Sequence, residues 1–297
     1  MQKVKGVIAL SRYKEVLGNV ALLTVFGLFL TITPGAVQTA DLRSSRVVTI
    51  IILLAANILA TTFAFMINDV EDAEDDAKDE KKAKRNPISA GHISRNFGYV
   101  VSFSVAFLAL LLYLLLDTKT FLVGLSLIVL GFLYSWKKVR LKGMPFLDIL
   151  SHGYFLAGGI LLASFFPFSS DLSLVLPPFL VAYTISIAGD LFNEIRDFTV
   201  DRKAGLKNTV SIIGLRPSVI FKTLMYITAA VLGIFVAYTH FSSFNPVALL
   251  GGLVVTVAIF IYVHLFSSRP IADLDNALLF NSLITVAFLV ITISIFY

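Results

Sequence analysis

The sequence predicts an all-α integral membrane protein with about nine transmembrane helices around a central cavity. Apolar residues make up 57% of the 297 residues, charged residues make up only 14%, and the mean hydropathy is +0.87. A soluble domain of this length does not need so much apolar side chain. Buried helices of a soluble protein are a poor alternative, because such helices keep one polar face and these segments mostly do not.

Apolar segments long enough to cross a bilayer, which takes about 17 to 25 helical residues, recur along the whole chain. In chain order they cover residues 16–33, 46–67, 97–116, 119–135, 146–167, 173–191, 218–240, 246–267 and 276–296. We therefore interpret residues 1–297 as a single multi-pass domain in a cell membrane, with the lipid bilayer as its first partner.

Basic residues predict the orientation of these helices. With nine crossings, the N-terminus and the loops after the even-numbered helices share one side of the membrane. Only Arg43, Arg46 and Lys119, of the 24 Lys and Arg residues, fall on the other side. Because loops rich in Lys and Arg stay in the cytoplasm, the N-terminus and the even-numbered loops are predicted to be cytoplasmic. Topology accounts for the net charge of +5, so no nucleic-acid partner is inferred.

Two similar acidic clusters follow the second and the sixth predicted helices. The first, NDVEDAEDD at residues 68–76, holds six carboxylates, and the second, NEIRDFTVD at residues 193–201, repeats its pattern after 125 residues. On a helix Asn68, Asp72 and Asp76 lie at i, i+4 and i+8 and share one face. Both clusters should emerge on the same side of the membrane, where they can converge. The repeat also suggests two pseudo-repeats, about 1–140 and 141–297.

The residue types of these clusters predict binding of Mg²⁺ and a diphosphate. Carboxylate oxygens are ligands for Mg²⁺, which is usually held by one or two carboxylates together with substrate phosphates. Two facing clusters could hold two ions with a diphosphate between them. Basic residues that suit the remaining phosphate charge lie directly downstream of each cluster. They are Lys78, Lys81, Lys82, Lys84 and Arg85 after the first, and Arg202, Lys203 and Lys207 after the second.

The apolar part of such a substrate would extend between membrane helices rich in Phe, Leu, Ile and Val, which suits an isoprenoid tail. Breaking an allylic carbon–oxygen bond requires neutralisation of the diphosphate leaving group, which metal ions and basic side chains supply. A cavity inside the membrane would also keep water from the resulting carbocation.

The two clusters resemble the two Asp-rich motifs of the UbiA superfamily of intramembrane prenyltransferases. The stretch RNPISAG at residues 85–91 is similar to that family's Asn-Arg-Pro-x-x-x-Gly segment with its first two residues transposed. The stretch DRKAG at residues 201–205 is similar to the second motif of members that prenylate quinone precursors. The resemblance covers essentially the whole chain. It implies cytoplasmic helical loops over the cavity mouth, two Mg²⁺ ions, a prenyl diphosphate donor and a lipophilic acceptor.

By motif position, the resemblance assigns Asn68, Asp72 and Asp76 to the first metal and diphosphate site and Asn193, Asp197 and Asp201 to the second. Asp69, which the second cluster replaces with Glu194, completes the predicted metal set. Asn68, Asn193, Arg85, Arg202, Lys203 and Lys207 are the predicted substrate-binding residues.

Three further residues are candidates for the chemistry itself. Asp190 lies on the helical face of Asn193 and Asp197 but deeper in the membrane, where a carboxylate is usually functional. It is either a base or part of a third site, or a hydrogen-bonded structural group. Tyr134 and Lys138 are predicted to share one face at the end of the fourth helix. The resemblance suggests that this Tyr stabilises a carbocation, whereas an interfacial aromatic anchor is the structural alternative.

A cation-coupled transporter is the main alternative function, because paired acidic residues also occur in such proteins. Transporter acids lie near the middle of the bilayer in broken helices, whereas these clusters lie at helix ends and continue into basic loops. A metal-free scaffold is disfavoured because its clustered carboxylates would repel one another. The acceptor stays open among quinone-precursor aromatics and other lipids, with a lean toward the former from the second motif.

Overall fold

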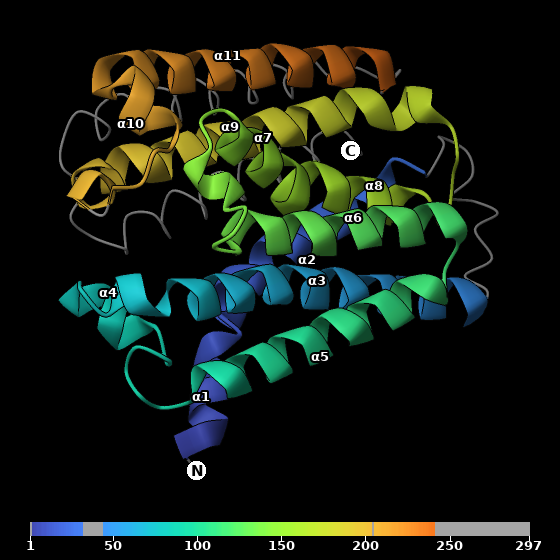
Figure 1. Ribbon diagram of the computed structural model, residues 1–297. Helices are drawn as coiled ribbons and strands as arrows, with labels where there is room; N and C mark the ends of the chain where they lie inside the picture. The colour runs from blue at the N-terminus through green and yellow to red at the C-terminus, as the bar shows by residue number, and fades with distance from the viewer. Residues whose placement is uncertain (1, 32–43, 204, 241–297) are drawn as a thin grey trace. The chain divides into compact units, whose positions relative to one another are not determined.

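The protein is described from a computed structural model, which describes residues 2–31, 44–203 and 205–240. Within these residues every regular element is helical and no strand occurs (Figure 1). The chain divides into two compact units, Met1–Val175 and Leu176–Tyr297. Each unit is described by itself.

The first unit is a bundle of helices. Its helices are α1 (Gln2–Leu10), α2 (Tyr13–Phe29), α3 (Ser44–Asp76), α4 (Glu80–Arg85), α5 (Arg95–Leu114), α6 (Thr118–Ser135), α7 (Leu147–Gly153) and α8 (Gly159–Phe165). A single 3₁₀ turn, η2 (Leu141–Gly143), precedes α7, and a π-helical turn, η3 (Tyr154–Gly158), joins α7 to α8. Side chains close the starts of three helices: Asp79 caps α4, Ser94 caps α5 and Asp117 caps α6.

Helix α3 is the centre of the first unit, because it packs against α2, α5, α6 and α8. Figure 1 shows α3 running beside α5 along most of its length. Buried apolar side chains of α3, among them Ala56, Phe63 and Ile67, form the middle of the core. Gly124 of α6 lets that helix lie directly against the Tyr113 ring of α5, where a Cβ atom would overlap the ring.

A buried polar group crosses this apolar core. Asn57 Nδ2 donates hydrogen bonds to Thr24 Oγ1 and to Ser164 Oγ, both over 2.9 Å. Tyr113 donates its hydroxyl proton to Asn57 Oδ1 over 2.7 Å. The four residues come from α2, α3, α5 and α8, so this network ties four helices together where water is absent.

The second unit contains the greater part of α9 (Leu172–Lys203), followed by α10 (Thr209–Ile213) and α11 (Leu215–His240). Asn208 caps α10, and Gly214 has a φ of 85°, which lets the chain turn sharply from α10 into α11. Glu194 of α9 accepts a hydrogen bond from the Val210 backbone N–H, which ties α10 to α9.

Six segments of the described residues are long and apolar enough to cross a membrane: Arg46–Asp76, Arg95–Leu114, Thr118–Ser135, Leu147–Phe165, Leu172–Arg202 and Leu215–Val236. They confirm the all-α multi-pass membrane class and six of the predicted spans. The predicted span 16–33 corresponds to α2, which has 17 residues and is not among the six. The predicted spans 246–267 and 276–296 lie outside the described residues. The count of nine is therefore not confirmed.

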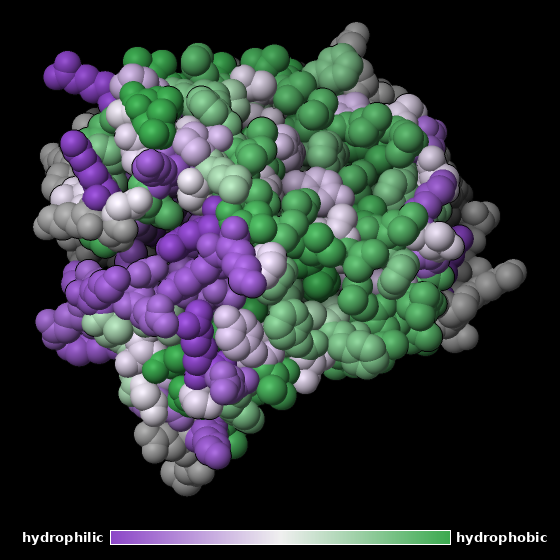
Figure 2. Space-filling view, viewed as in Figure 1, coloured by the Kyte–Doolittle hydropathy of each residue, from purple (hydrophilic) through white to green (hydrophobic). Residues whose placement is uncertain are grey.

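The polar surface of the first unit is concentrated at one end. In Figure 2 hydrophilic residues gather over the α4 end of α3, whereas the surface of α5 and α6 away from that end is mainly hydrophobic. Exposed apolar side chains such as Phe107, Leu114 and Leu122 belong to this hydrophobic surface. Such a surface fits contact with lipid, and the polar end marks the place where α3 leaves the apolar layer.

Candidate active site

The first acidic cluster is the last part of α3. The predicted membrane span ended at residue 67, but the helix continues from Ile67 to Asp76 without a break. The predicted sharing of one helical face by Asn68, Asp72 and Asp76 therefore holds in the backbone. The helix continues beyond the end of the apolar run, because hydrogen bonds and ion pairs stabilise the polar turns that follow.

Basic side chains from three other segments neutralise this cluster. Arg12, which precedes α2, makes a two-point ion pair with Asp69. At the start of α5, Arg95 Nη1 lies 2.9 Å from Glu74 Oε1. The turn after α6 contributes Lys137, Arg140 and Lys142, of which Lys137 Nζ lies 2.6 Å from Glu74 Oε2.

Asp69 is bound by Arg12. Both of its carboxylate oxygens accept hydrogen bonds from Arg12, and its side chain is only 1% exposed. Burial disfavours a charged guanidinium, but the Asp69 carboxylate outweighs that effect, so the pKa of Arg12 lies above its ordinary value. Asp69 is therefore engaged in an ion pair that ties the N-terminal segment to α3.

Of the two carboxylates on this face of α3, Asp72 is more exposed than Asp76. Lys142 Nζ donates a hydrogen bond to Asp72 Oδ2. The other oxygen, Oδ1, is buried without a hydrogen-bond partner, and Arg140 Nη2 lies 3.7 Å from it. A buried carboxylate oxygen without a donor is an unusual and costly feature, which fits the loss of a cation that would bind there.

Asn68 and Asp76 complete this face of α3 with neutral partners. Asn68 Nδ2 donates to Ser135 Oγ at the end of α6, over 3.1 Å. Asp76 Oδ2 accepts a hydrogen bond of 2.9 Å from Asn86 Nδ2, and the same nitrogen donates to the Asp69 backbone carbonyl over 2.8 Å. Asn86 is fully buried and thus fixes the Asp76 carboxylate against the end of α3.

The second cluster lies within α9, which continues to Lys203 instead of giving way to a loop at Phe192. Arg196 pairs with the adjacent Asp197 through two bonds of 2.9 and 3.0 Å. Asn208 Nδ2 donates to Asp201 Oδ2 over 3.1 Å. Asn193 is half-buried, and Asp190 is 5% exposed. In this cluster Glu194, the counterpart of Asp69, accepts a hydrogen bond from the Val210 N–H in α10.

A model of the UbiA prenyltransferase family matches residues 20–288 of this chain. The match covers both acidic clusters and most of the chain. This protein belongs to the UbiA prenyltransferase family.

Similar proteins act on several isoprenoid substrates. A lycopene elongase/hydratase of Haloarcula japonica is 29% identical over 184 residues, which are 61% of this chain and 60% of that relative. A digeranylgeranylglyceryl phosphate synthase of Pyrococcus horikoshii is 28% identical over 181 residues, which are 61% of this chain and 59% of that relative. The matches thus span about three fifths of these relatives.

The fold agrees with a solved UbiA structure over almost the whole chain. A UbiA homologue from Archaeoglobus fulgidus, bound to GPP and Mg²⁺, superimposes with a TM-score of 0.71 over 97% of this chain and 99% of that chain. The two sequences are 18% identical, so this likeness establishes the fold.

The UbiA motif residues do not form a ready-made metal cage. Among the described residues no group of three or more His, Cys, Asp or Glu side chains is placed to hold an ion. In the first cluster the carboxylates have separate partners: Asp69 binds Arg12, Asp72 binds Lys142, and Asp76 binds Asn86. Asp72 Oδ1 has no hydrogen-bond partner and shares its helical face with Asn68 and Asp76, so it fits the role of a metal ligand. In this structure it faces the cation Arg140.

The prediction that Lys138 shares a helical face with Tyr134 is wrong. Helix α6 ends at Ser135, so the spacing of four residues has no helical meaning there. Lys138 is exposed, and its Nζ lies 5.6 Å from the centroid of the Trp136 ring. Tyr134 packs its ring edge-on against Phe155 of the π-helical turn, 5.1 Å between centroids. Tyr134 therefore has a packing role that the sequence could not reveal.

Three of the predicted phosphate-binding cations are exposed. Arg85 ends α4 and is exposed, and Arg202 and Lys207 are exposed as well. The placement of the Lys203 side chain is outside what the structure describes. The three exposed cations contrast with Lys142, which is 9% exposed. Sequence reasoning had not selected Lys142, Arg140, Arg12 or Asn86.

Lys222 is another residue that the sequence analysis did not select. It lies in α11 and is fully buried, and its Nζ lies 5.4 Å from the centroid of the Phe192 ring on α9. Its ammonium has no hydrogen-bond partner among the described residues. A cation inside a membrane helix is uncommon. Lys222 lies within the predicted apolar span 218–240 and was not singled out from the sequence.

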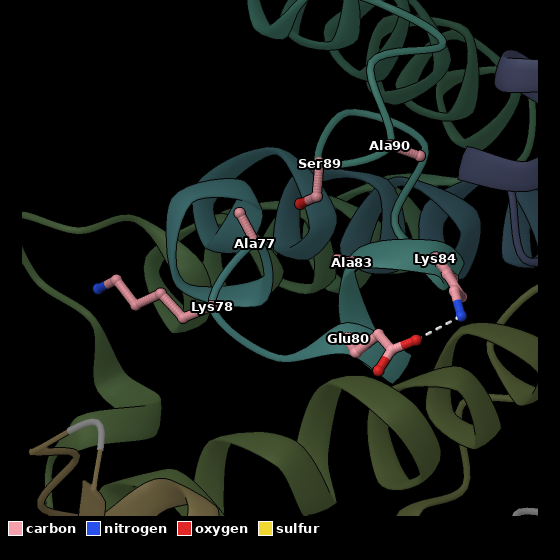
Figure 3. A pocket seen from close by; sticks show the side chains of 7 residues that line it. All are labelled: Ala77, Lys78, Glu80, Ala83, Lys84, Ser89 and Ala90. Carbon is pink, nitrogen blue, oxygen red and sulfur yellow. Dashed lines mark hydrogen bonds and ion pairs between the residues drawn. The ribbon is translucent and has the colours of Figure 1, made fainter.

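A shallow pocket of about 470 Å³ lies beyond the first cluster, between the end of α3 and the turn after α4. Figure 3 shows the Glu80–Lys84 ion pair at one rim and the Lys78 side chain extending away from the others. Ser89 and three alanines complete its lining. None of these residues is a predicted metal ligand, so the pocket is not the candidate active site.

Proposed function

We propose that this UbiA family member transfers a prenyl group from a prenyl diphosphate to a lipophilic acceptor inside the membrane. The observation that carries the proposal is the face of Asn68, Asp72 and Asp76 at the polar end of α3, with a buried Asp72 oxygen that lacks a donor. Solved relatives of the same fold are described as bound to GPP and Mg²⁺ and to DMAPP and Mg²⁺, which supports this type of donor here.

The residues proposed to bind the metal ions and the diphosphate are Asn68, Asp72 and Asp76 in the first motif and Asn193, Asp197 and Asp201 in the second. Bound Mg²⁺ would neutralise the charge that develops on the diphosphate when the allylic carbon–oxygen bond breaks. Asp69 is left out of this set, because Arg12 occupies both of its oxygens. Exposed Arg85, Arg202 and Lys207, together with Lys203, are proposed to contact the diphosphate.

The reaction proposed here breaks the bond between the allylic carbon and the diphosphate oxygen, and the electron pair leaves with the diphosphate. An electron-rich atom of the acceptor then bonds to that carbon and loses a proton. Asp190, buried in α9 about 10 Å from Asp197 at 1.5 Å per residue, is proposed to take this proton. Tyr134 is proposed to face the carbocation with its ring.

An isoprenoid lipid is proposed as the acceptor. The two curated relatives above are named for reactions on a carotenoid and on an isoprenoid glyceryl phosphate. The lean toward a quinone-precursor aromatic rested on the second motif alone and receives no support from these relatives. No observation favours the cation-coupled transporter. The cytoplasmic side of both motifs remains part of the proposal.

The test uses purified full-length protein with Mg²⁺, prenyl diphosphates of increasing length and three acceptors: a carotenoid, an isoprenyl glyceryl phosphate and a quinone-precursor aromatic. Diphosphate release and product mass are measured. We expect turnover with one of the two lipid acceptors, and at least a 100-fold loss for Asp72→Asn because an essential transition-state interaction is removed. Donor binding that is unchanged in EDTA would contradict the metal-dependent site.

A further inference from the structure

We infer that Lys142 is a built-in counter-ion that competes with the metal for Asp72, so that metal binds strongly only together with the diphosphate. This inference rests on the proposed function. It assigns to the turn after α6 a role in coupling the binding of metal to the binding of the donor.

The pairing of Lys142 with Asp72 is unusually well protected. Lys142 is only 9% exposed. A lysine is almost never buried unless it is paired, and Lys142 is paired with Asp72. The Asp72 side chain is 17% exposed. Lys142 thus places its positive charge beside the carboxylate that we propose as a metal ligand. There it reduces the negative potential that would attract a metal ion.

The backbone holds Lys142 in this position at some conformational cost. Arg140 directly before the η2 turn has a φ of 53°, which a non-glycine residue rarely adopts. The turn is closed by hydrogen bonds from Gly143 N–H to the Arg140 carbonyl, 2.8 Å, and from Met144 N–H to the Leu141 carbonyl, 2.9 Å. A strained turn persists only where its surroundings hold it, and here the ion pairs to α3 do so.

Arg140 extends the same effect to a second carboxylate. Its Nη2 lies 3.1 Å from Asp75 Oδ2 and 3.7 Å from Asp72 Oδ1. Two cations from one turn therefore face Asp72, one near each carboxylate oxygen. A metal ion that arrives alone must displace or share these cations. Arg140 would keep its ion pair with Asp75, whereas Lys142 pairs with no carboxylate other than Asp72 among the described residues.

A diphosphate changes this balance, because its oxygens offer the displaced Lys142 ammonium a new partner. The energy lost when Lys142 leaves Asp72 is then recovered on the donor. Binding of metal and binding of diphosphate should consequently favour each other by the same factor. This arrangement accounts for the pairing of Asp72 with protein cations in the absence of a metal ion.

The direct test is the affinity of the donor-free protein for Mn²⁺, measured by the paramagnetic resonance signal of free Mn²⁺. Lys142→Met should raise that affinity about tenfold, because a competing charge is removed. Lys137→Met is the matched control: it removes a cation of the same turn, but that cation is bound to Glu74. It should change the affinity less than twofold. Equal or weaker Mn²⁺ binding by Lys142→Met would overturn the inference.

Asp72→Asn separates this inference from the proposed function. If Asp72→Asn abolishes Mn²⁺ binding while Lys142→Met has no effect, only the counter-ion role is wrong. If Asp72→Asn leaves Mn²⁺ binding intact, the proposed metal site itself is wrong.

A second measurement uses the unmodified chain, in case Lys142→Met does not fold. Acylation of Lys142 by a water-soluble amine reagent is followed by peptide mass spectrometry. Saturating Mn²⁺ alone should raise the labelling of Lys142 severalfold, because the ammonium leaves Asp72. Adding inorganic diphosphate should protect Lys142 again. Labelling that stays constant in all three conditions would overturn the inference.

Discussion

Asn86 shows how a single neutral side chain can position a charged one. Its Nδ2 bridges the Asp76 carboxylate and the Asp69 carbonyl, while its Oδ1 accepts the Ile88 N–H over 3.0 Å. The side chain is fully buried. The turn that follows α4 is thereby attached to the last turn of α3, at the carboxylate proposed to bind metal.

Asn86→Ala is therefore expected to weaken donor binding about tenfold or more and to destabilise the protein by about 1–3 kcal/mol, because it leaves buried acceptors without a donor. Ser89→Ala is the matched control. Ser89 Oγ also anchors this turn to α3, through the Ala73 carbonyl at 2.7 Å, but does not touch a motif carboxylate. Titration calorimetry with a prenyl diphosphate and a thermal melt measure both effects.

If Ser89→Ala lowers donor affinity as much as Asn86→Ala, the turn acts by its position alone. Asn86 would then have no specific effect on Asp76.

At the scale of elements, the Asn57 network locks four helices of the first unit. Tyr113→Phe removes one hydroxyl and leaves Asn57 Oδ1 buried without its donor. We expect a loss of about 1–2 kcal/mol in unfolding free energy, toward the upper range for hydrogen bonds inside membranes. Turnover per folded molecule should stay near normal, because none of these residues belongs to the candidate site.

Tyr154→Phe provides the comparison, because it removes a hydroxyl that lies 2.8 Å from Ser126 Oγ in a part-buried place. Its unfolding free energy should fall by less than half as much. Reversible unfolding in mixed detergent measures both variants. Equal losses would show that the Asn57 network contributes no more to the unfolding free energy than the part-buried hydrogen bond of Tyr154.

Hydropathy predicts the membrane helices of this protein well, because the signal is local. The predicted span 97–116 corresponds to α5 (Arg95–Leu114), and 119–135 corresponds to α6 (Thr118–Ser135). The end of α3 was missed, because its last turns are polar and are stabilised by basic side chains from elsewhere. No local pattern distinguishes such a helix end from a loop.

The motif residues were predictable, but their partners were not. Asn68, Asp72 and Asp76 follow from their spacing, whereas Arg12 reaches Asp69 across 57 positions and Lys142 reaches Asp72 across 70. Such pairs are fixed by tertiary packing, of which a single sequence holds no direct record. The wrong placement of Lys138 has the same origin, since the spacing argument assumed a helix that ends at Ser135.

At the scale of the whole molecule, the decisive prediction concerns the side of the membrane on which each motif lies. The chain has no cysteine, so single cysteines introduced at exposed positions report their own side without background. Lys81→Cys follows the first motif, and Arg216→Cys lies at the start of α11 after the second; both should react only from the cytoplasmic side, as the distribution of basic residues predicts. Lys119→Cys, near the start of α6, should react only from the outside. Labelling of intact cells with a membrane-impermeant maleimide, before and after permeabilisation, measures all three.

If Lys81→Cys and Arg216→Cys react from opposite sides, the two motifs cannot hold one diphosphate, and the proposed transferase must be abandoned whatever the outcome for Lys142. If all three react as expected, both acidic motifs share the compartment that supplies the soluble head of the donor, while the apolar helices are left to receive its isoprenoid tail.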